Sequence, residues 1–183
     1  QLDMLAAFVP YATPGYLPFI MLSYQSVYGN LYNSYSEVFR PPYDTLIPQL
    51  FDGQTGMGTI NSMLPSIPRL MIDSLYADQF FADSLHPARV ALRDNDLYDW
   101  VPQAPVRMGY CRNDDQVTYL NALVTEQHMN GLGAASVVAI EYDSVLLHSD
   151  CGQPSIVFSK LWFDSLADLC VPVTSAEDLP ADQ

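Results

Sequence analysis

The second half of the sequence alternates between strand-like and helix-like segments, and this order constrains the fold more than any other feature. Residues 105–111 and 136–141 are short and largely apolar, and the second run is β-branched enough for a buried parallel strand. Between them, apolar residues from 117 to 124 recur at the helical period, and Pro154 is placed to open a last helix. A strand–helix–strand–helix order predicts two parallel strands joined by a right-handed crossover. We therefore predict an α/β fold for this part of the chain.

The first half has a different character, because it is rich in Pro and Tyr and shows no alternating strand pattern. The first predicted helix has Thr13 as its N-cap, Pro14 at its first position and Gly29 as its stop. Further short helices are predicted over residues 42–51, 66–75, 77–84 and 86–93, with a turn at 36–39. The sequence thus divides into a helical region at 1–100, an α/β region at 101–170 and an acidic tail at 171–183.

The chain is strongly acidic, since 7 Lys and Arg against 21 Asp and Glu give a formal net charge of −14. This charge opposes binding to nucleic-acid phosphates and to anionic membrane surfaces. Residues 4–36 carry no formal charge, but Pro10, Pro14 and Pro18 interrupt them, so we expect no transmembrane helix. Residues 1–4 lack the basic segment of a signal peptide, which favours a mature or truncated start.

The three cysteines, Cys111, Cys151 and Cys170, form no CxxC motif, and no cysteine–histidine cluster has the spacing of a zinc site. We therefore expect neither a metal nor another cofactor. An odd number of cysteines leaves one thiol free or paired with a partner outside the chain.

Candidate catalytic residues, two aspartates and a histidine, follow the predicted strands. Asp114 and Asp115 come directly after the first strand, and His148 follows the second. The carboxyl ends of parallel strands meet at one edge of a sheet, where α/β folds place their active sites. An Asp that precedes and orients a His is the acid–base part of a Ser-His-Asp triad. The alternatives are an Asp that caps the next helix and a His in a surface loop. His86 and His128 are less well placed.

The acid and histidine segments together resemble the C-terminal end of the α/β-hydrolase family. Cys111, Asp114 and Val117 form the pattern C-x-x-D-x-x-V, and His148 and Cys151 form H-x-x-C. The closer resemblance is to secreted bacterial lipase- or esterase-like serine hydrolases. It implies that Asp114 is the acid of a Ser-His-Asp triad and that His148 is its general base and then its general acid. It also implies a Cys111–Cys151 disulfide, with two buried thiols as the alternative, and a secreted, periplasmic or cell-surface location.

In these hydrolases a helical lid precedes the acid strand. Four segments resemble that lid and its exit, at residues 36–39, 42–45, 50–53 and 95–100. The resemblance covers about residues 1–168 and implies the C-terminal part of an α/β-hydrolase fold, with a helical cap followed by two parallel β/α units. The implied substrate is a carboxylic ester or a lipid-like small molecule. The aromatic residues between 11 and 39 could line its acyl pocket or form core between lid and sheet.

The chain departs from the family in one respect, because it has no nucleophile motif G-x-S-x-G. Its Gly-x-Gly pairs enclose Met57 and Leu132, so neither supplies a serine. The family places that serine upstream of the lid, which here means before Gln1. We therefore expect the chain alone to be inactive and to need a missing N-terminal half or another chain. The alternatives are a non-catalytic protein that binds a ligand with its aromatic cap, and a fragment of a prolyl-oligopeptidase-type peptidase.

Overall fold

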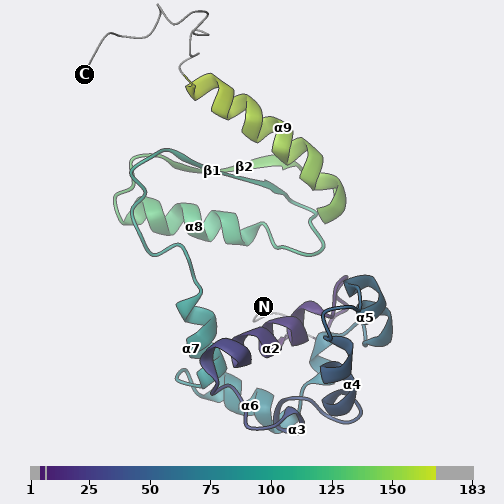
Figure 1. The fold of residues 1–183 in the computed structure, drawn as a ribbon. Coiled ribbons are helices and arrows are strands. Elements are labelled where there is room, and N and C mark those ends of the chain that lie inside the picture. Colours follow the sequence, from purple (N-terminus) through teal and green to yellow (C-terminus); the bar gives the residue numbers. More distant parts are fainter. Residues whose placement is uncertain (1–4, 7, 168–183) are drawn as a thin grey trace, which may run out of the picture. The chain divides into compact units, whose positions relative to one another are not determined.

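The computed structural model describes residues 5–6 and 8–167. They form two compact units, one up to Trp100 and one from Val101 onward (Figure 1). Cys170 and the acidic tail at 171–183 lie outside the described residues, as do residues 1–4. Each unit is described by itself below.

The first unit is helical. Its elements are α2 (Tyr16–Tyr28), α3 (Tyr35–Val38), α4 (Tyr43–Leu50), α5 (Met57–Met63), the 3-10 helix η1 (Pro68–Met71), α6 (Ser74–Ala82) and α7 (Pro87–Asp94). Within the described part of this unit, strand pairing is limited to a single antiparallel bridge between Phe39 and Ile72. Side chains from several of these helices are fully buried together, among them Val38, Phe39, Ile47, Met71 and Phe80. The unit therefore has its own hydrophobic core.

Local capping explains where several of these helices begin and end. The Asp73 side chain caps α6 by accepting from the backbone N–H groups of Leu75 and Tyr76. Gly29 ends α2 with a φ of 71°, the left-handed conformation that glycine adopts without steric cost. The helix end predicted at Gly29 is therefore confirmed.

Other expectations for the first unit need correction. Helix α2 begins at Tyr16, with Gly15 and not Thr13 at the N-cap position, and it has no side-chain cap. The backbone carbonyls of Thr13 and Pro14 accept the N–H groups of Tyr16 and Leu17 instead. The helix predicted over 66–75 is divided, since η1 ends at Met71 and Asp73 starts a new helix. Helix α5 was not predicted, because glycines at its start disfavour a helix in isolation.

The predicted aromatic set between residues 11 and 39 is only partly buried. Phe39 is fully buried and Tyr32 nearly so, whereas the Phe19 side chain is 51% exposed. Burial raises the pKa of Tyr32 to about 12. Most of these rings therefore lie at the surface of the unit or at its margin, not in its core.

The second unit consists of β1 (Val106–Cys111), α8 (Leu120–Gly131), β2 (Val137–Asp143) and α9 (His148–Leu166). The two strands pair in parallel, with Val106 opposite Val137, which confirms the predicted pairing. Helix α8 lies on one face of the strands and α9 on the other (Figure 1). On the α9 face, the Tyr142 ring stacks on Phe158 with ring centroids 4.9 Å apart.

This two-stranded sheet leaves much apolar surface open. Parallel sheets are normally wider and covered on both faces. Here the exposed apolar side chains of α8 and α9 include Leu120, Val124, Ile156, Leu161 and Phe163. None of the helices in the described residues is both long enough and apolar enough to cross a membrane.

The starts of both helices in the second unit differ from expectation. Helix α8 begins at Leu120, so Asp114 and Asp115 lie in a loop and do not open the helix. Helix α9 begins at His148, six residues before Pro154, which lies inside the helix. A residue 33 positions earlier supports this helix start, because a side-chain oxygen of Asp115 accepts the backbone N–H of His148. The predicted loop histidine is thus the first residue of a helix.

Candidate active site

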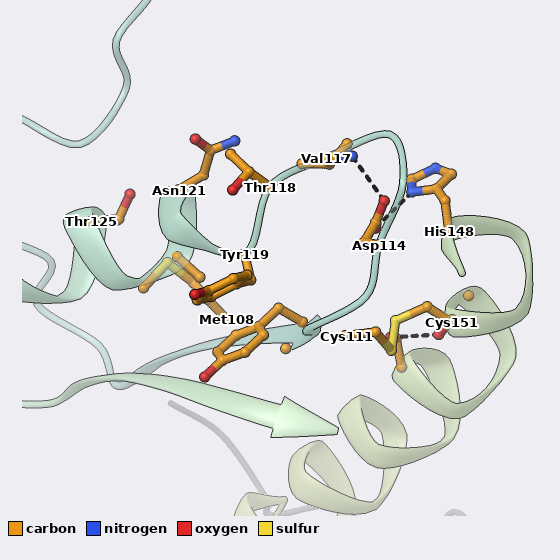
Figure 2. Close-up of a pocket in the computed structure, with 15 residues that line it drawn as sticks. Met108, Cys111, Asp114, Val117, Thr118, Tyr119, Asn121, Thr125, His148 and Cys151 are labelled. Atoms are coloured by element: carbon orange, nitrogen blue, oxygen red, sulfur yellow. Dashed lines mark hydrogen bonds and ion pairs between the residues drawn. A yellow bond between two sulfur atoms is a disulfide. The ribbon is translucent and has the colours of Figure 1, made fainter. Parts of the chain in front are cut away.

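Asp114 and His148 are directly hydrogen-bonded at the carboxyl ends of the two strands. The distance from His148 Nδ1 to Asp114 Oδ2 is 2.8 Å (Figure 2). The carboxylate is largely covered, with 12% of its side chain exposed, whereas the imidazole is 42% exposed. Because a carboxylate only accepts, the neutral ring must carry its proton on Nδ1, which leaves Nε2 as the basic nitrogen.

The other oxygen of Asp114 holds the loop in which it lies. Asp114 Oδ1 accepts the backbone N–H groups of Gln116 at 2.9 Å and Val117 at 2.8 Å. Burial by itself raises the pKa of Asp114, but the hydrogen bonds from Val117, His148 and Gln116 outweigh it and lower that pKa below its ordinary value. Asp114 therefore stays ionised at neutral pH and serves the loop and the imidazole at the same time.

Several bonds tie the loop after β1 to the segment after β2. The disulfide implied by the resemblance is present between Cys111 and Cys151, which are 40 residues apart. The backbone N–H of Arg112 donates to the carbonyl of Asp143 at 2.9 Å. The side-chain amide of Asn113 donates to the carbonyl of Val145 at 3.1 Å. The two segments that carry Asp114 and His148 are thus fixed to one another.

An open pocket of about 450 Å³ lies beside the pair and is bounded by β1, the loop after it and the starts of α8 and α9. Tyr110 and Tyr119 line it and stack with ring centroids 5.6 Å apart. Figure 2 shows His148 and Asp114 at one end of this pocket, Tyr119 near its middle and Thr125 on the far side. Within the part of the chain that the structure describes, His148 Nε2 has no hydroxyl or thiol partner. The pocket hydroxyl of Ser155 donates to the Cys151 carbonyl.

The other two histidines lie elsewhere in the described part of the chain, each in a helical context. His86 caps α7 through its Nδ1, which accepts the N–H of Ala88, and its ring packs edge-on against Tyr76. His128 lies in the last turn of α8. Over residues 5–6 and 8–167, no three His, Cys, Asp or Glu residues gather as a metal site would require.

Asp114 and His148 are the acid–base pair predicted from the sequence, and the structure places their side chains in contact. No contact was predicted for Asp115 or Asn113, although both lie in the same polar run after β1. The only sequence signal for these contacts is the polar run Asn113–Asp115 close to the end of the strand, because Asn and Asp side chains readily bond backbone groups. Their partners are more than 30 residues away, so no local rule could have found them.

No protein-family model matches the chain, and no curated protein matches it. Solved structures do. A protein from Legionella pneumophila assigned as a hydrolase has a TM-score of 0.72 at 23% identity, over 84% of this chain and 40% of its own. The rice cell wall degrading esterase LipA from Xanthomonas oryzae has a TM-score of 0.69 at 23% identity, over 91% and 45%. A ligand-bound form of LipA gives a TM-score of 0.69 at 22% identity. The chain therefore shares its fold with hydrolase and esterase structures, and it spans less than half of their length.

Proposed function

We propose that this chain is the C-terminal part of a serine ester hydrolase and supplies the acid and the histidine of its triad. The observation that carries the proposal is the bond from His148 Nδ1 to Asp114, which leaves Nε2 open toward a pocket. The fold shared with an esterase supports it. In this role the first unit is a helical lid, and the second holds the last two β/α units of the sheet.

The chemistry follows from the two nitrogens of the imidazole. His148 Nε2 takes the proton of a serine hydroxyl as its oxygen attacks the ester carbonyl, and then gives that proton to the leaving alcohol. Water repeats the sequence on the acyl-serine and releases the acid. Asp114 remains ionised throughout, keeps the proton on Nδ1 and stabilises the imidazolium that forms.

The serine must come from sequence that this chain does not contain, either an N-terminal half or another chain. In the described residues β1 pairs with β2 alone, so one edge of β1 is open. The pocket that holds Asp114 and His148 borders this strand. A further parallel strand added to β1 would end at the same edge of the sheet and bring its following loop to the pocket. It would also cover apolar surface of α8 and α9.

The disulfide supports an oxidising compartment, so we propose secretion, the periplasm or the cell surface as the location. The proposed substrate is a carboxylic ester or a lipid-like small molecule.

The experiment compares p-nitrophenyl ester hydrolysis and labelling by a fluorophosphonate probe for two samples. The first sample is this chain alone. The second is the complete protein, in which this chain is preceded by an N-terminal half that carries the G-x-S-x-G motif. We expect neither turnover nor adduct for the chain alone, and both for the complete protein. His148→Ala in the complete protein should lower turnover by about four orders of magnitude, whereas Asp150→Asn, a charge change in the same helix, should not. Undiminished turnover in His148→Ala would refute the assignment of the base.

One observation favours a second candidate, a non-catalytic binding protein. Over the described residues, the nitrogen that a nucleophile would need has no hydroxyl partner. A complete protein that binds apolar esters but gives no fluorophosphonate adduct would support this candidate.

A further inference from the structure

Five consecutive residues, beginning with the last residue of β1, each contact the end of β2, the segment that follows it or the start of α9. The contacts are Cys111 to Cys151, Arg112 N–H to Asp143 O, Asn113 to Val145 O, Asp114 to the His148 ring and Asp115 to the His148 N–H. Two of these five contacts are to His148, and they come from the neighbouring carboxylates of Asp114 and Asp115. Asp114 bonds its ring, and Asp115 bonds its backbone.

The contact of Asp115 meets a need of α9. The first N–H groups of a helix have no partner within the helix, and a side chain just before the helix usually supplies one. The residue in that position here is Leu147, whose side chain cannot accept a hydrogen bond, and no side-chain cap is formed. Asp115 Oδ1 lies 3.2 Å from the His148 nitrogen and provides the acceptor from 33 residues away. Its negative charge also suits the positive end of the helix.

The position of Nε2 depends on both bonds. The hydrogen bond to Asp114 fixes one ring nitrogen, but the Cα of His148 lies in the first turn of a helix, where fraying is usual. If the backbone shifts, the ring can keep its bond to Asp114 only by turning, and Nε2 then points elsewhere. With the backbone and Nδ1 both held, the direction of Nε2 is defined.

We propose that Asp115 is a positioning residue for His148, which holds the backbone of the histidine while Asp114 holds its ring. The inference rests on the proposed function, since it takes His148 as the base. Asp115 contacts neither the pocket nor the reacting atoms, so its effect on catalysis is transmitted entirely through His148.

The first test measures amide hydrogen exchange at His148 by NMR in the full chain, with Asp115→Ala, Asp115→Asn and the control Asp150→Asn. Loss of the acceptor in Asp115→Ala should speed exchange of the His148 amide about tenfold, the effect of losing one capping hydrogen bond. Asp115→Asn keeps an accepting oxygen and should stay within about twofold of the unsubstituted chain. Asp150→Asn removes a charge from the same helix end but no hydrogen bond to His148, so it should change the rate by no more than about threefold. Equal rates in Asp115→Ala and the unsubstituted chain, or equal acceleration by Ala and Asn, would overturn the proposal.

The second test measures turnover by the complete protein, per active site counted with a fluorophosphonate. Asp115→Ala should lower kcat about tenfold with KM unchanged, and Asp115→Asn should restore it. A purely structural role would lower the thermal midpoint or the number of active sites and leave kcat per site unaltered, which would also overturn the proposal. Lack of turnover in the unsubstituted complete protein would refute the proposed function, whereas the exchange rates decide by themselves whether Asp115 holds His148.

Discussion

Removing the Cys111–Cys151 disulfide should destabilise the second unit by an amount that follows from its position in the chain. The two cysteines are 40 residues apart, and the loop that they close contains α8, all of β2 and the start of α9. For a loop of this length the chain-entropy relation gives about 13 cal/mol/K, which is about 4 kcal/mol at 25 °C. We therefore expect the double variant Cys111→Ala/Cys151→Ala to lose about 4 kcal/mol of unfolding free energy, because its unfolded chain is no longer constrained.

The assay is urea unfolding followed by the fluorescence of Trp162, in a Trp100→Phe background that leaves this ring as the single reporter. Trp162 lies in α9, and the Arg107 guanidinium sits 4.8 Å from its ring centroid, so its emission reports the second unit. The control is the same chain with the disulfide reduced, which should lose nearly as much stability as the double variant. If the oxidised chain, the reduced chain and the double variant unfold within about 1 kcal/mol of each other, the loop-closure reasoning is refuted.

Three further outcomes are expected. Gly109→Ala should cost about 1–3 kcal/mol, because its Cβ would lie 1.8 Å from a ring carbon of Tyr142, and the cost in urea unfolding should largely vanish in a Tyr142→Ala background. Burial lowers the pKa of His86, so this side chain binds fewer protons in the folded state than in the unfolded state. Thermal melts should therefore show stability falling as pH drops below about 6.5, and the variant His86→Asn should reduce this pH dependence. Hydrogen bonds lower the pKa of Asp114, so its contribution should be present above the ordinary aspartate pKa and lost as pH falls through the lowered value; an acid titration of Asp114→Asn that shows the same loss would contradict this.

The sequence predicted those parts of the fold that depend on local pattern. The apolar runs at 105–111 and 136–141 are strands in the structure, and they pair in parallel as the strand–helix–strand order requires. The helix end at Gly29 was also predictable, because the left-handed conformation that ends the helix depends on the glycine itself and not on distant partners. Asp114 and His148 meet because the ends of neighbouring parallel strands share an edge of the sheet.

The elements that were missed depend on distant partners. Helix α9 begins at His148 because Asp115 caps it from another loop, whereas the local signal, Pro154, pointed six residues too late. Helix α5 forms despite Gly58 within it, and its Ile60 is buried in the core of the first unit. Tertiary packing overrides a weak intrinsic helix propensity in that case. The disulfide came from a resemblance to known hydrolases, since the three cysteines alone allow several pairings.

The central claim is that Asp114 orients His148 so that Nε2 is the free, basic nitrogen. The most direct test is nitrogen-15 NMR of the His148 ring at about pH 8, where an ordinary imidazole is neutral. The account predicts a proton held on Nδ1 and an unprotonated Nε2, and it predicts that this preference disappears in Asp114→Ala. A ring that carries its proton on Nε2, or a tautomer that is unchanged by Asp114→Ala, would contradict it.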